Sequence, residues 1–353
     1  ELYNKNSILI IKLRTLVDVP ALDILLQIYL IFMFYPFQSL KTGDSFFASC
    51  EMARRPDLRG LAVVTGEERG IATAMSTEAK RLGITRGMPV HQIRREFPSV
   101  VVLKSDYESY AMYSKRMTDI VRRYTPDVEE YSIDECFADL TGLRRSLRMS
   151  YPDIARAIKY DLQTELGMTF SAGLSLTKVL AKTASKHKKP DGLTCIPGYK
   201  IEEYLASTPA KSIWGIGPNT AVYLEKLGIR TALELVKKDL SFVETYLTKP
   251  TIERWRELRG ESVLKLETSK KTEYKSIMKT RTFTPPSGDR SVLLGELSRN
   301  IESACARLRH YGLYAKEINF YIKGQDFRHY GADIEMAVAG CMPEKFLEAV
   351  QNN

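Results

Sequence analysis

Two adjacent carboxylates, Asp134 and Glu135, form the clearest chemical pattern in the sequence. They lie within residues 131–140, an otherwise strand-like run, and neighbouring residues on a regular strand point to opposite faces. The two acids can therefore serve one site only if the chain turns there, at the tip of a hairpin. Hard carboxylate oxygens with no His or Cys nearby favour Mg²⁺ or Mn²⁺. A solvated turn that carries two acids is the alternative.

Several lysines follow a Gly turn near residue 173. Lys178 and Lys182 are four residues apart, which places them on one face of the helix predicted over residues 177–185. Lys189 follows on a turn, in the run Lys-Pro-Asp-Gly. A nucleoside triphosphate needs such cations opposite its metal ions, so the pattern indicates a triphosphate site. A solvated basic helix face is the alternative.

A glycine hairpin gives the third pattern. Gly215 and Gly217 lie in the run Trp-Gly-Ile-Gly-Pro, and Leu-Gly-Ile follows at residues 227–229. Glycines let backbone N–H groups approach a phosphate without interference from a Cβ atom. The spacing is typical of a helix-hairpin-helix motif, which binds a DNA backbone without reading bases. Gly-x-Gly alone is a weak signal, and the second run makes it more specific.

The composition agrees with a globular protein that binds an anion. The chain has 353 residues, 44% hydrophobic and 27% charged, with a net charge of +9. These values exclude a disordered tail or a coiled-coil rod and predict two or more domains. The positive balance favours nucleic acid as a partner. The five cysteines contain no CxxC pair, which argues against a disulfide framework or a zinc site and fits a reducing cytoplasm.

Residues 1–40 differ from the rest, because they are very apolar and carry little charge. The apolar run at 24–35 is about 12 residues long, shorter than the roughly 20 that a spanning helix needs, so we expect no membrane segment. No small-residue cleavage site follows it, which argues against a signal peptide. A foreign or frameshifted N-terminus explains this atypical segment most simply.

The elements that must position these residues alternate between strands and helices. Because two strands at 128–140 form a hairpin within that alternation, the pattern favours an α+β fold over a doubly wound parallel sheet. Other strands are predicted at 61–64 and 169–174, and helices at 77–82, 107–124, 152–166 and 177–185. A mostly helical stretch then leads to a Lys-rich linker at 265–275. The last segment is predicted to contain strands at 276–283, 316–322 and 332–338 and helices at 292–311 and 343–350.

In this order, the three patterns resemble the Y-family of translesion DNA polymerases. The resemblance runs from about Asp44 to the C-terminus, and several further motifs carry it. These are Asp-Ser-Phe-Phe-Ala-Ser-Cys-Glu at 44–51, Pro-Asp-Leu-Arg-Gly at 56–60, Ala-Thr-Ala at 72–74, Glu-Ala-Lys-Arg-Leu-Gly at 78–83 and Gly-Met-Pro at 87–89.

The resemblance implies a multidomain right-hand polymerase of α+β class. Its parts would be the palm (41–53 and 104–192), the fingers (54–103), a helical thumb (193–264), the linker (265–275) and a C-terminal α/β little finger (276–353) that ends early. The implied activity is template-directed insertion of deoxynucleotides opposite damaged bases, with low fidelity. Primer-template DNA and deoxynucleoside triphosphates are the implied partners, with a sliding clamp as a further one, in the cytoplasm and away from membranes.

The resemblance also assigns site residues. Asp134 and Glu135 match two of the three carboxylates that hold two catalytic Mg²⁺ ions, and Phe47 matches the aromatic steric gate that excludes a 2′-OH. Ser132 belongs to the acidic motif as support for the turn. The triphosphate-binding positions are Lys80, Thr77 and Lys189, and the DNA-binding ones are Gly215, Gly217, Lys279 and Arg281.

One position departs from the family. The first metal-binding Asp corresponds to Thr42, which offers only a neutral hydroxyl, and residues 41–43 lack the apolar pattern of the strand that should carry it. Asp44 is on the same strand face, roughly 6.6 Å further along. Asp18 is a displaced candidate if residues 19–43 are an insertion. The alternative function is therefore a non-catalytic or impaired DNA-binding relative.

Overall fold

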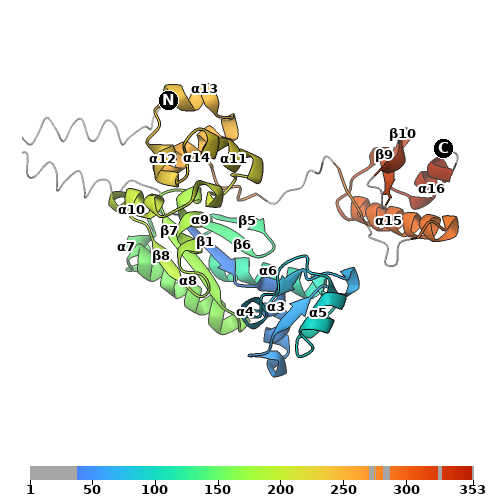
Figure 1. Cartoon of the computed structure of the whole chain (residues 1–353), viewed down its shortest axis with the longest axis horizontal. Helices are drawn as coiled ribbons and strands as arrows, with labels where there is room; N and C mark the ends of the chain where they lie inside the picture. Colours follow the sequence, from blue (N-terminus) through green and yellow to red (C-terminus); the bar gives the residue numbers. More distant parts are fainter. Residues whose placement is uncertain (1–37, 270–273, 275, 281–286, 325–327, 352–353) are drawn as a thin grey trace, which may run out of the picture. The chain divides into compact units, whose positions relative to one another are not determined.

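The computed structural model describes residues 38–269, 274, 276–280, 287–324 and 328–351, and side chains from Gly43 onward. The chain divides into two compact units, Glu1–Ser269 and Lys270–Asn353. Figure 1 shows the first as a sheet with helices packed around it and the second as helices beside a strand pair. Among the helices described, none combines the length and apolar character that crossing a bilayer requires.

A five-stranded sheet organises the first unit, in the order β5-β6-β1-β7-β8. The central strand β1 (Gln38–Gly43) is antiparallel to β6 (Glu135–Asp139) and to β7 (Phe170–Ser175). At the edges, β5 (Val128–Ser132) is antiparallel to β6, and β8 (Leu193–Cys195) is parallel to β7. The mixed directions confirm the α+β class and the predicted hairpin.

Helices cover both faces of this sheet. Alternate residues of β7 face opposite ways: Phe170 and Leu174 join the core beneath α6 (Tyr107–Arg122) and α8 (Tyr151–Leu166), whereas Gly173 faces α9 (Lys178–His187). A Cβ atom at Gly173 would lie 2.0 Å from a backbone oxygen of α9, so only glycine lets that helix approach. Helix α3 (Phe46–Arg54) follows β1 and packs against α6, and the short α7 (Leu143–Leu147) precedes α8.

Local sequence explains the long helix α8. Pro152 lies in its first turn, where a missing N–H costs nothing. The Ser150 side chain caps the start by accepting from the Asp153 N–H, and Gly167 ends the helix with φ 65. Its inner face is fully or almost fully buried, as the four-residue apolar spacing predicts, at Ile154, Ile158, Leu162 and Leu166.

A smaller sheet, in the order β3-β2-β4, belongs to the same unit. It consists of β2 (Val63–Thr65), β3 (Ala74–Met75) and β4 (Val101–Leu103). Its core includes Val64, Met75, Ile84 and Ile93. The other elements here are the 3₁₀ helices Pro56–Leu58 and Glu67–Arg69 and the helices α4 (Thr77–Arg81) and α5 (Val90–Glu96).

The stretch after β8 is helical, as predicted, and has its own core around Leu224, Leu235 and Trp255. Its α-helices are α10 (Ile201–Ala206), α11 (Pro218–Lys226), α12 (Ala232–Val236), α13 (Leu240–Tyr246) and α14 (Lys249–Leu258), with 3₁₀ helices at Gly198–Lys200 and Ala210–Ser212.

The second unit contains α15 (Arg290–His310), the antiparallel pair β9 (Ala315–Lys323) and β10 (His329–Gly340), and α16 (Pro343–Gln351). The predicted strand at 276–283 is wrong for residues 276–280, which form no strand. Ile277 packs against the core of this unit through its side chain, and apolar packing without ladder hydrogen bonds does not make a strand. Residues 281–283 lie outside the described residues.

The expectation that residues 41–43 do not form a strand is also wrong. They end β1, which pairs along both edges, so neighbouring strands impose an extended conformation that the local sequence does not favour. The predicted displaced ligand Asp18, the apolar run at 24–35 and Arg281 all lie outside the described residues.

Candidate active site

The two adjacent acids lie where the sequence predicts a turn. Ile133 and Asp134 form the turn between β5 and β6, and Glu135 is the first residue of β6. The Ser132 hydroxyl donates to a carboxylate oxygen of Asp134 at 2.7 Å, which is the turn support expected of it. The Gly43 N–H donates to the Asp134 carbonyl at 2.9 Å, so the hairpin tip is fixed to the end of β1.

The strand register places Thr42, the position that differs from the expected Asp, beside this hairpin tip. Thr42 is the cross-strand partner of Glu135 on one edge of β1 and of Ser171 on the other. A carboxylate at residue 42 would therefore belong to the strand position directly opposite Glu135. The backbone of residue 42 therefore lies where the sequence analysis expects a metal-binding carboxylate, and a threonine occupies that position.

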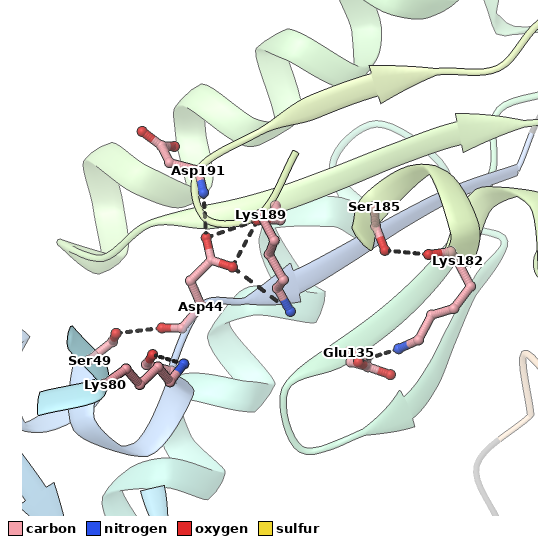
Figure 2. A network of polar contacts seen from close by, with 10 residues as sticks. Asp44, Ser49, Lys80, Glu135, Lys182, Ser185, Lys189 and Asp191 are labelled. Carbon is pink, nitrogen blue, oxygen red and sulfur yellow. Dashed lines mark hydrogen bonds and ion pairs between the residues drawn. The ribbon is translucent and has the colours of Figure 1, made fainter. Parts of the chain in front are cut away.

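The lysines of α9 have protein partners. Lys182 makes an ion pair with Glu135, in which both side chains are at least 85% buried (Figure 2). Lys178 pairs with Glu129 at 2.6 Å, and both are more than 90% buried. Lys178 and Lys182 thus share a helix face, as predicted, but it faces the β5–β6 hairpin and is not a solvated surface. Their charges neutralise carboxylates of the sheet in this structure, and contact with a triphosphate stays a prediction.

Asp44 belongs to a separate polar network (Figure 2). Its carboxylate is 95% buried and accepts from the Ser171 hydroxyl at 2.8 and 3.0 Å and from the Asp191 N–H at 2.8 Å. Lys189 Nζ lies 3.8 Å away, and the Ser49 hydroxyl donates to the Asp44 carbonyl at 2.6 Å. These contacts tie the start of α3 to β7 and to the loop before β8.

The structure does not bring Asp44 together with Asp134 and Glu135 as a metal-binding set. In the part of the chain that the structure describes, no group of three His, Cys, Asp or Glu side chains is placed to hold a metal ion. The Asp44 carboxylate already accepts hydrogen bonds from the Ser171 hydroxyl and the Asp191 N–H. Its position suits fixing the backbone more than ligating an ion.

Two predicted triphosphate residues, Lys80 and Lys189, lie near each other around Asp44 (Figure 2). Lys80 Nζ donates to the Ser45 hydroxyl at 2.8 Å. Partial burial and the positive charge of Lys189 both lower the pKa of Lys80. Thr77 is the first residue of α4, the helix that also carries Lys80. The structure thus gathers cations from distant segments beside α3.

Phe47 is half-buried, whereas its neighbour Phe46 lies in the core with 4% exposed. The Phe47 ring stacks on Tyr110 with centroids 4.5 Å apart and planes 11° from parallel. Tyr107 meets the same ring edge-on at 5.6 Å. One of the two adjacent phenylalanines therefore serves the core, and the other keeps an accessible part.

The glycine hairpin forms the predicted turn. Gly215 has φ +88, and a Cβ atom there would lie 2.5 Å from the Arg254 side chain, so the position needs glycine. Gly217 caps the start of α11. Between them and the sheet, Trp214 contacts Tyr131 at a ring distance of 5.2 Å and donates to its hydroxyl at 3.2 Å. In the second unit, Lys279 is half-buried, and Arg281 lies outside the described residues.

Comparison with known proteins decides the family. Residues 43–186 match the impB/mucB/samB family and residues 274–352 match its C-terminal domain. A DNA polymerase IV of Halorhodospira halophila is 33% identical over 287 residues, which cover 80% of each chain. The chain belongs to the Y-family of translesion DNA polymerases. It is therefore a DNA-directed DNA polymerase of the kind that carries out translesion synthesis, as the sequence predicts.

Other members of the family agree. The protein SamB of Salmonella typhimurium is 32% identical over 299 residues, covering 82% of this chain and 70% of SamB. Among solved structures, a Y-family DNA polymerase chimera of Dbh and Dpo4 superposes with a TM-score of 0.71 at 20% identity, covering 90% of this chain and 93% of the chimera. That likeness confirms the multidomain polymerase fold.

Sequence reasoning missed several residues that support the candidate site. Ser171 and the Asp191 N–H hold Asp44, and Glu129 pairs with Lys178 of α9, whereas Glu135, the partner of Lys182, was predicted as a site residue but not for this ion pair. The sequence did contain a signal for the lysine ion pairs. Two lysines lie on one face of a helix, and an acidic hairpin precedes that helix, so ion pairs between the two elements could have been predicted. For Ser171 the sequence contains no such signal.

Proposed function

We propose that this Y-family polymerase joins deoxynucleotides to a primer at the tip of the β5–β6 hairpin, with Asp134 and Glu135 as the metal-holding carboxylates. The observation that carries the proposal is the turn at Asp134, which places both acids next to the end of β1. Family membership supports the reaction class, and the hairpin geometry supports this location for the reaction.

The donor set fits a magnesium ion that arrives with its nucleotide. Mg²⁺ in such enzymes is commonly held by one or two carboxylates together with substrate phosphates and water, and two carboxylates are present here. When bound, the metal would neutralise charge on the phosphates and the attacking oxygen. Lys182 neutralises Glu135 in the structure, so we expect this ion pair to loosen when a cation binds. A second Mg²⁺, or Mn²⁺, would need a further ligand from the nucleotide or the primer.

The other site residues receive roles on the same basis. We propose that Lys80 and Lys189 contact the triphosphate, with Thr77 beside them, because the structure gathers both lysines around Asp44. Phe47 would act as the steric gate against a 2′-OH. Gly215, Gly217, Lys279 and Arg281 would contact the DNA backbone.

We assign the polymerase parts as the sequence predicts them. The palm comprises 41–53 and 104–192, the fingers 54–103, the thumb 193–264, the linker 265–275 and the little finger 276–353. The division of the chain after Ser269 falls within the proposed linker, and the three-stranded sheet falls within the proposed fingers. A sliding clamp as partner and a cytoplasmic location rest on the family resemblance alone.

Primer extension with Mg²⁺ tests the proposal, on an undamaged template and on one with an abasic site. Asp134→Asn and Glu135→Gln should each abolish extension while DNA binding, measured by fluorescence anisotropy, stays unchanged. Glu130→Gln is the matched control, because Glu130 lies on the same hairpin in an exposed ion pair with Arg122. If the unchanged chain binds DNA but extends no primer, the catalytic proposal fails.

Substitutions at Thr42 test the metal-binding role more directly. Thr42→Asp restores the family carboxylate opposite Glu135 and should increase the rate of extension, whereas Thr42→Asn should not. Extension that appears only in Thr42→Asp would identify the natural chain as a DNA-binding relative that lacks catalysis. Equal rates in both variants would show that residue 42 takes no part in metal binding.

A further inference from the structure

The ring of Phe47 is held by a second helix. Tyr107 and Tyr110 are three residues apart on α6, so they project from one side of that helix toward α3. Tyr110 stacks against Phe47 nearly in parallel at 4.5 Å, and Tyr107 meets its edge at 5.6 Å and 80°. Both arrangements are preferred aromatic geometries. Together the two tyrosines restrict where the Phe47 ring can lie.

Tyr110 is itself fixed by the helix that carries Phe47. Its ring is fully buried, and its hydroxyl donates to the Glu51 carboxylate at 2.7 Å. Glu51 is 7% exposed and follows Phe47 by four residues, so both lie on the same face of α3. Burial and this hydrogen bond raise the pKa of Tyr110, which keeps the hydroxyl protonated and able to donate. The contacts form a closed loop from Glu51 to Tyr110 to Phe47.

A ring that selects by shape must be held in a narrow range of positions. A shift of a fraction of an ångström would change the space available beside a sugar carbon. Phe47 is only half-buried, so the core does not immobilise it on every side. The stacked face against Tyr110 determines which side of the ring stays accessible.

We propose that Tyr110, anchored by Glu51, is a positioning residue that sets how strongly Phe47 excludes ribonucleotides. The inference rests on the proposed role of Phe47 as the steric gate. Tyr110 does not touch the nucleotide, and it acts by holding the ring of Phe47.

The test measures discrimination between dATP and ATP opposite a template thymine. Binding to a complex with a dideoxy-terminated primer gives a ratio of Kd values that needs no chemistry, and primer extension gives a ratio of kcat/KM. Tyr110→Leu should lower the deoxynucleotide preference about tenfold, the scale on which aromatic stacking fixes a ring. Tyr110→Phe keeps the ring and loses only the hydrogen bond to Glu51, so we expect a loss of about threefold.

Controls separate positioning from general damage to the fold. Tyr113→Leu removes another aromatic from the same helix, 7% exposed, and should leave the preference unchanged at a comparable loss of Tm. Phe47→Ala should abolish the preference, and adding Tyr110→Leu to it should change nothing further, because Tyr110 acts through Phe47. If Tyr110→Leu fails to fold, the deoxynucleotide preference of Tyr110→Phe alone tests the positioning role.

Three outcomes would overturn the inference. The first is that both Tyr110 variants keep the natural preference for dATP over ATP while Phe47→Ala loses it. Phe47 would then act as the gate without help from Tyr110. An additive effect in the double variant would assign Tyr110 an independent role. A natural preference in Phe47→Ala would refute the gate itself, and the positioning role would fall with it.

Discussion

Replacing Glu257 should strongly destabilise the larger unit, because this carboxylate joins three segments. It lies on α14 and is fully buried. One oxygen accepts from the Val179 N–H at 3.2 Å, and the other accepts from the N–H groups of Val263 and Leu264, both at 2.8 Å. Val179 is in the first turn of α9, where N–H groups have no partner within the helix and a negative charge is favourable.

The magnitude follows from the donors that lose their partner. Glu257→Ala leaves the buried N–H group of Val179 and the part-buried N–H groups of Val263 and Leu264 without their partner, and an unpaired buried group costs about 1–3 kcal/mol. Because neighbouring groups relax together, we expect a total loss of about 4 kcal/mol in the free energy of unfolding. Glu257→Gln keeps one oxygen and turns an NH₂ group toward a donor, so about 2 kcal/mol should be lost.

Urea unfolding followed by tryptophan fluorescence measures this loss. Both tryptophans, Trp214 and Trp255, lie in the helical region that Glu257 joins to α9. Glu261→Gln is the matched control, because Glu261 is 55% exposed in an ion pair with Arg259 and should contribute less than about 1 kcal/mol. A Glu257→Ala protein within about 1 kcal/mol of the natural one would refute the reasoning, since water would then satisfy the three donors.

Three further predictions concern packing and pH. Gly173→Ala should cost about 3 kcal/mol in urea unfolding, because the added methyl group meets the backbone of α9 at Ala181. Trp214→Ala removes the ring contact and hydrogen bond to the sheet hairpin and should cost about 2 kcal/mol, visible as a lower Tm. Burial and a hydrogen bond to Asp161 raise the pKa of Tyr124 to about 12, so its contribution to stability is complete below pH 10 and is lost as the pH rises toward 12. Tyr124→Phe should reduce the slope of the urea midpoint against pH in that range, and an unchanged slope would contradict the assignment.

The sequence predicts the elements with strong local signals. The apolar spacing and the end signals of α8 are visible in the sequence. Asp134 lies on a turn, as expected if it and Glu135 serve one site. The family motifs then lead to Phe47, Lys80 and Lys189.

Contacts between distant segments could not be predicted in the same way. Asp44 and Ser171 are 127 residues apart, and Lys182 pairs with a glutamate 47 residues before it. No periodicity encodes such pairs, since only the sheet order brings them together. The strand character of residues 41–43 likewise comes from pairing on both sides of β1 and not from their own side chains.

The central place of β1 also affects how the protein folds. This strand comes before both of its neighbours in the chain, yet β6 and β7 must pair with it from either side. During synthesis, β1 therefore keeps one edge unpaired until residue 175 has emerged from the ribosome. Closing such long loops is entropically costly and slows folding. We expect the α6–α8 pair and the β5–β6 hairpin to assemble first, and the proposed active site to form only when β1 pairs with both of its neighbours.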